Sequence, residues 1–99
     1  MILKKIVFTN KNTFFESYNV TIFNAINDNT IHKILHRQLY FINRKKMLNK
    51  IILIFDGFEI DDDNENIKEL IYNNSAYGIL LIFNQCKISK KIMSDIFII

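Results

Sequence analysis

Two polar side chains stand at the ends of apolar runs and are candidates for chemistry. Asp56 follows the run 51–55, and Gln85 comes two residues after the run 79–83. An uninterrupted apolar run is typical of a buried strand in a parallel sheet, and α/β proteins bind ligands where such strands end. A carboxylate there can hold Mg²⁺ through water, and an amide can sense a phosphate or orient an attacking water. The alternative is structural: Asp56 caps a turn with Gly57, and Gln85 is a solvated loop residue.

The elements that must position these side chains begin with strands. β-Rich or continuously apolar segments predict strands at residues 2–9, 20–23, 51–55, 79–83 and 96–99. A helical segment separates the strand before Asp56 from the strand before Gln85, and strands joined by a right-handed crossover are usually neighbours. We therefore expect the two side chains to lie near each other at one edge of the sheet.

Two amphipathic helices are predicted between the strands. Thr30 is a suitable N-cap for the first, whose apolar residues recur at helical spacing for about four turns, with cations at residues 44–46 at its far end. The second follows the acidic residues 61–65 and ends near Asn73. A short helical turn is expected at 88–93. The alternation of buried strands and amphipathic helices predicts an α/β fold, a three-layer sandwich with a mostly parallel sheet.

Composition limits the function classes. The chain has 99 residues, of which 49% are apolar and 23% charged, which is typical of one small globular domain and not of a disordered chain. Its net charge of +3 is too small to indicate nucleic-acid binding through charge alone. The single cysteine, Cys86, excludes an internal disulfide and favours a reducing, intracellular compartment. The apolar runs are too short to span a membrane, so no membrane association is expected.

Other possible sites have simpler interpretations. His32 and His36 have a spacing that can chelate a metal, with Cys86 as a third ligand, but ordinary surface histidines are the favoured interpretation. The acidic residues 61–65 lack the glycine and glutamate of a calcium-binding loop, and a solvated helix N-terminus explains them. The scattered lysines and arginines lack interleaved aromatic residues, which favours a solvated face.

Several segments resemble the DNA-packaging ATPases of poxviruses and other large DNA viruses, a branch of the FtsK/HerA class of P-loop NTPases. These segments are ILKKIVFTN, similar to the strand after the P-loop helix; DNTIHKILHRQLYFINRKK, similar to the long helix that follows; IILIFDG at the Walker B position; and IKELIYNNSAYGILLIFNQCKISKKI, similar to the helix, strand and sensor glutamine beyond it. Their order and spacing agree over nearly the whole chain.

The resemblance implies roles for the two candidate residues. Asp56 falls on the Walker B aspartate, which holds Mg²⁺ through water and helps to bind the nucleotide, and Gln85 falls on the sensor glutamine. The implied cofactors are ATP and Mg²⁺. The activity of such ATPases is ATP hydrolysis coupled to moving DNA into a capsid by a ring oligomer. The implied location is the host cytoplasm, a viral factory or the virion.

The chain also departs from that family. It contains no G-x-x-x-x-G-K-[ST] segment, so nothing supplies the amide cradle and the lysine that bind the β- and γ-phosphates. Gly57 stands where a second acid usually follows the Walker B aspartate, and Glu59 or Asp61 would have to act as the base. Ser75 and Met93 stand at or near two positions where such ATPases usually carry arginines.

The sequence therefore predicts one partial P-loop NTPase-like domain over residues 1–99. It would comprise the post-P-loop, Walker B and sensor strands, be inactive alone, and be a fragment, a degenerate copy or one half of a split protein. In this fold class the P-loop strand lies between the sensor strand and the last strand, so its absence would leave a hydrophobic edge. The alternative is a non-enzymatic interaction module that pairs with itself or with a full-length ATPase. The expected partners are a second copy or a P-loop-bearing chain, with DNA contacted only indirectly.

Overall fold

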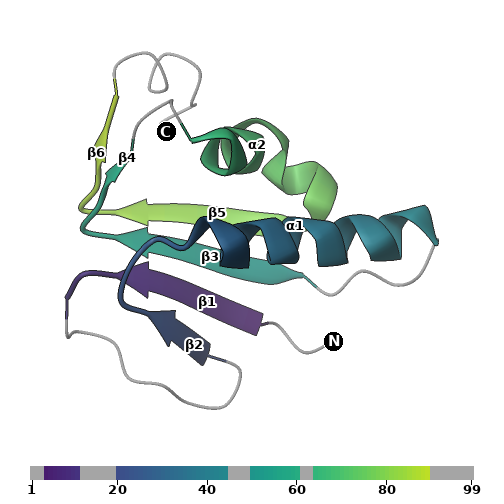
Figure 1. Ribbon diagram of the computed structural model, residues 1–99, viewed down its shortest axis with the longest axis horizontal. Helices are drawn as coiled ribbons and strands as arrows, with labels where there is room; N and C mark the ends of the chain where they lie inside the picture. Colours follow the sequence, from purple (N-terminus) through teal and green to yellow (C-terminus); the bar gives the residue numbers. More distant parts are fainter. Residues whose placement is uncertain (1–3, 12–19, 45–49, 61–63, 90–99) are drawn as a thin grey trace.

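The chain forms an α/β fold around a parallel sheet (Figure 1). The computed structural model describes residues 4–11, 20–44, 50–60 and 64–89. The main sheet contains β1 (Lys4–Thr9), β2 (Val20–Phe23), β3 (Ile51–Asp56) and β5 (Ile79–Asn84), in the spatial order β2-β1-β3-β5. The predicted α/β class is confirmed, and so is the expected adjacency of the strands that carry Asp56 and Gln85. The strand predicted at 96–99 lies outside the described residues.

Two helices connect the strands. Helix α1 (Asp28–Asn43) follows β2, helix α2 (Glu65–Asn73) precedes β5, and a 3₁₀ helix, η1 (Asn74–Tyr77), joins α2 to β5. The predicted N-cap of α1 at Thr30 is wrong, because the side chain of Asn27 accepts from the backbone N–H groups of Asn29 and Thr30. No helix of the described residues is long and apolar enough to cross a membrane.

A second, short sheet lies beyond the carboxyl ends of the main strands. It pairs β4 (Glu59–Ile60) with β6 (Lys87–Ile88) in parallel. The helical turn predicted to begin at Ile88 is therefore wrong at that residue, which pairs with Ile60; residues 90–93 lie outside the described part of the chain. A two-residue strand is too short to show a periodic pattern in the sequence.

The core lies between the sheet and the two helices, which cover the same face (Figure 1). Alternate residues of β1 and β3 point to this face and pack on α1 and α2, as the period of two requires. Four phenylalanines cross the sheet in register near its carboxyl end, with stacked neighbours 5.1–5.5 Å apart between ring centroids; they are Phe23, Phe8, Phe55 and Phe83. This aromatic row anchors the ends of all four strands.

The opposite face of the sheet carries apolar side chains that no described helix covers. On the inner strands β1 and β3, Val7 and Ile54 are buried. On the edge strand β5, Leu80 is 57% exposed and Ile82 is 39% exposed. Among the described residues, β5 pairs with a strand on one side only, where it meets β3. Within the part of the chain that the structure describes, the parallel sheet therefore presents both an apolar surface and a strand edge at β5.

Candidate functional site

A row of polar residues crosses three strands at their carboxyl ends. Thr9, Asp56 and Asn84 are in register on β1, β3 and β5, one position beyond the aromatic row and on the opposite face. Asp56 is only 1% exposed. Its Oδ2 accepts a hydrogen bond from Thr9 Oγ1 at 2.7 Å, and its Oδ1 accepts one from Asn84 Nδ2 at 2.8 Å. Donors from both neighbouring strands thus satisfy the carboxylate.

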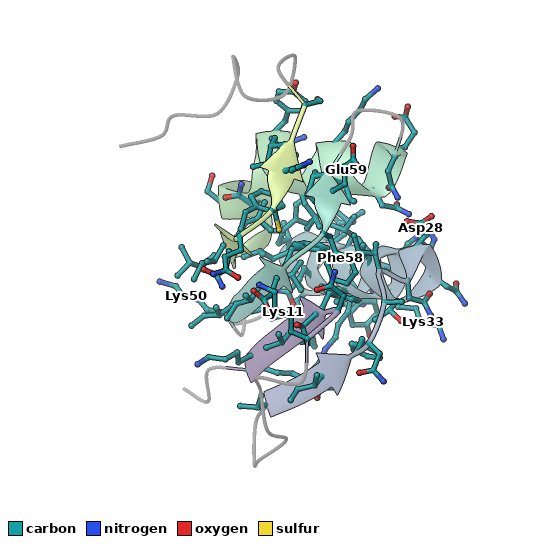
Figure 2. All side chains as sticks on the ribbon, turned by 90° about the vertical axis from the view of Figure 1, so that its left-hand side faces the viewer. Lys11, Asp28, Lys33, Lys50, Phe58 and Glu59 are labelled. Atoms are coloured by element: carbon teal, nitrogen blue, oxygen red, sulfur yellow. The ribbon has the colours of Figure 1, made fainter. Side chains whose placement is uncertain are left out.

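Lys11 brings a positive charge to this row. Its Nζ lies 4.0 Å from Asp56 Oδ1 and also donates to Gln85 Oε1. The backbone N–H of Lys11 donates to Thr9 Oγ1 at 3.0 Å, which fixes the chain as it leaves β1. Figure 2 looks onto the carboxyl ends of the strands and shows Lys11 beside the ends of β1 and β3. The two predicted site residues, Asp56 and Gln85, are therefore brought together by one ammonium group.

The pKa of Asp56 lies below its ordinary value of 3.8. The hydrogen bond from Thr9 contributes most to lowering it, burial of the carboxyl opposes that effect, and Asn84 and the charge of Lys11 lower it further. Each of these donors stabilises the ionised form more than the neutral form. The carboxylate is therefore ionised across the physiological pH range.

Backbone geometry fixes the two turns beside the row. Gln85 adopts a left-handed conformation with φ of 51°, which turns the chain sharply after β5 and exposes its side chain. Gly57 has φ of 81°, and its carbonyl accepts from Asn10 Nδ2 at 2.7 Å. A Cβ at position 57 would overlap Asn10 Oδ1. The positive φ favours glycine at this position, more than the contact with the exposed Asn10 side chain does.

Of the two proposed substitutes for that acid, Glu59 does not join the row. Glu59 lies exposed on β4, in register with Lys87 of β6, and Figure 2 shows it well away from Lys11. Asp61 lies outside the described residues, as does Met93. Ser75 belongs to η1, which precedes the amino end of β5, so it lies at the other end of the sheet from Asp56. Among the described residues, no carboxylate other than that of Asp56 contacts the row.

Sequence reasoning missed three of the contributors. Thr9 was expected only as the last residue of the strand 2–9, and neither Asn84 nor Lys11 was assigned a role. The sequence does mark these positions, because polar residues end the apolar runs of both strands, at 9–11 and at 84–85. The register between β1 and β3, which places Thr9 beside Asp56, is not encoded in either segment alone.

The row as it stands does not fit a Mg²⁺ ion. Mg²⁺ needs oxygen ligands or waters in octahedral geometry, whereas the Lys11 ammonium already lies 4.0 Å from Asp56 Oδ1 and supplies a positive charge there. Within the described ranges, no group of three or more histidine, cysteine or acidic residues could hold a metal. The rings of His32 and His36 are 4.5 Å apart on α1, and Cys86 instead donates to the carbonyl of Phe55 at 3.3 Å.

Comparison with protein-family models, with curated proteins and with solved structures finds no match for this chain.

Proposed function

We propose that this chain is a partial relative of the viral DNA-packaging ATPases that does not hydrolyse ATP alone and acts by docking to a P-loop-bearing chain. The observation that carries the proposal is the meeting of Asp56 and Gln85 at the carboxyl ends of two adjacent parallel strands. Such an edge is where α/β proteins bind nucleotides. The sequence resemblance supplies the substrate class, ATP, and the process, DNA packaging.

The surface beside this edge supports docking. Asp56 shares its face of the sheet with Leu80 and Ile82, and these two apolar side chains are exposed. A surface hollow lined partly by Ile52, Ile79 and Leu80 opens at the start of β5, at the other end of the strand from the polar row. A partner strand that pairs along the whole of β5 would cover this apolar surface and end beside Asn84, in the polar row.

The incoming chain would supply what this chain lacks. A P-loop would bring backbone amides and a lysine for the phosphates of ATP, and Mg²⁺ would arrive with the nucleotide. In this chain, Gln85 would lie near the terminal phosphate, and Asp56 would face Mg²⁺ through water only after Lys11 had moved away from it. DNA would be contacted by the assembled ring and not by this chain alone.

A second candidate function is an interaction module that pairs with another copy of itself. The exposure of Leu80 and Ile82 on an edge strand favours it, because self-pairing of two such strands would cover both. In this case the polar row is structural and no nucleotide is involved.

Anisotropy of a fluorescent ATP analogue with Mg²⁺ tests the proposal on the whole chain. We expect no saturable binding at protein concentrations up to about 1 mM, because no P-loop holds the phosphates. Circular dichroism establishes that the sample is folded. Binding with a dissociation constant of about 10 µM or less, weakened by Asp56→Asn and unchanged by Glu59→Gln, would show instead that the chain holds a complete nucleotide site. Stable homo-oligomers without nucleotide, seen by sedimentation velocity, would favour the second candidate.

A further inference from the structure

We infer that Lys11 is a built-in cation that occupies the place of a metal beside Asp56 and keeps divalent ions out of this edge of the sheet. The inference deepens the proposed function, and it rests on that function for the identity of the excluded ion, Mg²⁺. The contacts that carry it are those of the Lys11 ammonium with Asp56 Oδ1, at 4.0 Å, and with Gln85 Oε1.

The position of Lys11 is fixed by more than its ammonium group. Its backbone N–H donates to Thr9 Oγ1 at 3.0 Å, and the same hydroxyl donates to Asp56 Oδ2 at 2.7 Å. Thr9 therefore ties the backbone of Lys11 to the carboxylate that the ammonium faces. The side chain of Lys11 is 38% exposed, so it lies at the boundary between the buried carboxylate and solvent.

A divalent ion at Asp56 would compete with Lys11. Asn84 and Thr9 each already donate to one oxygen of Asp56, and the ammonium lies 4.0 Å from Oδ1. A metal ion close to that ammonium would be repelled by it, and its waters would find the carboxylate shielded. The charge that a metal would supply is thus already present.

Removing the charge of Lys11 should convert the edge into a cation site. In the Lys11→Met variant, Asp56 keeps its two neutral donors but loses its counter-ion, and Gln85 Oε1 becomes free to act as an oxygen ligand. Divalent ions prefer such carboxylate and amide oxygens. Lys11→Arg keeps the positive charge and should keep the ion out.

Binding of Mn²⁺, followed by the loss of the free-ion signal in electron paramagnetic resonance, tests the inference without nucleotide. We expect Lys11→Met to bind Mn²⁺ at least about tenfold more tightly than the unsubstituted chain, because solvent partly screens the charge of Lys11 that this variant removes. Lys11→Arg and Lys50→Met, a change at an exposed lysine before β3, should behave like the unsubstituted chain. Adding Asp56→Asn to Lys11→Met should abolish the gain. Lys11→Gln provides a second neutral variant if the methionine variant does not fold.

Three results would overturn the inference. One is equal Mn²⁺ binding by the unsubstituted chain and both neutral variants; another is a gain that survives Asp56→Asn; the third is an equal gain in Lys50→Met. Micromolar binding of the ATP analogue by the unsubstituted chain would instead remove the proposed function. The two failures are therefore distinguishable.

Discussion

At the scale of single residues, the chemistry of this molecule is concentrated in one buried carboxylate. Asp56 receives hydrogen bonds from Thr9 on one neighbouring strand and from Asn84 on the other, so it ties three strands together at their carboxyl ends. A buried carboxylate that lost these donors would be strongly destabilising. The polar row therefore stabilises the fold as well as marking the candidate site.

The pH dependence of stability should report these contacts. The pKa of Asp56 is lower in the folded chain than its ordinary value, so its contribution to stability is complete above the unfolded pKa and is lost as pH falls through the folded pKa. We expect Thr9→Val to lower the free energy of unfolding by about 1–3 kcal/mol at neutral pH, because it removes the 2.7 Å hydrogen bond to Asp56. We also expect it to flatten the loss of stability below about pH 5, since it removes the largest contribution that lowers this pKa.

Urea unfolding from neutral pH to about pH 3 measures both effects. Thr21→Val is a matched control, because Thr21 lies on β2, outside the polar row. Its variant should keep the pH dependence of the unsubstituted chain. Parallel pH curves for Thr9→Val and the unsubstituted chain would show that the Thr9 hydrogen bond does not set the ionisation of Asp56.

The sequence predicted part of this row and not the rest, for a physical reason. The adjacency of the strands that carry Asp56 and Gln85 followed from the rule for crossovers between buried strands. The role of Lys11 depended on the register between β1 and β3 and on a side chain that folds back toward the sheet. Neither is visible in a local pattern of residue types.

At the scale of elements, strands with continuous apolar runs were predictable and helix ends were less so. The strands β3 and β5 begin where their apolar runs begin and extend one residue past the predicted ends, to Asp56 and Asn84. Helix α1 begins two residues before Thr30, because Asn27 and not Thr30 caps it. Both side chains are suitable caps in principle, so local chemistry did not decide between them.

The cap can be tested with a matched pair of substitutions. Asn27→Ala should lower the free energy of unfolding by about 0.5–2 kcal/mol, since it removes the acceptor for the backbone N–H groups of Asn29 and Thr30. Thr30→Ala should change it by less than about 0.5 kcal/mol, because Thr30 lies inside the first turn of the helix, where alanine is favourable. Chemical denaturation measures both. A larger loss in Thr30→Ala than in Asn27→Ala would contradict the cap seen in the structure.

At the scale of the whole molecule, the described helices cover one face of a parallel sheet. Parallel sheets in α/β proteins are covered on both faces, and the uncovered apolar residues here are concentrated on β5. The exposed side chains of β5, Leu80 and Ile82, lie on the same face of the sheet as the polar row, so one docked partner would cover both. This arrangement links the candidate site to association.

Association through this face is the last prediction. Leu80 and Ile82 are exposed by 57% and 39%, so burying what remains of each against a partner would contribute about 1–1.5 kcal/mol. Under the second candidate function, self-pairing, the chain should associate as its concentration rises. Leu80→Lys with Ile82→Lys should then shift it toward monomer while leaving its fold intact, because neither side chain is buried in the monomer. Leu39→Lys is the control: Leu39 is 41% exposed, but it lies on α1, on the helical side of the sheet.

Sedimentation velocity over a concentration series measures the shift. An unsubstituted chain that stays monomeric at every concentration, or a control that dissociates as readily as the double variant, would place the association elsewhere or remove it. Since a charged side chain at either position would also disfavour a docked strand from a different protein, the same double variant serves to test a P-loop-bearing partner as well as a second copy.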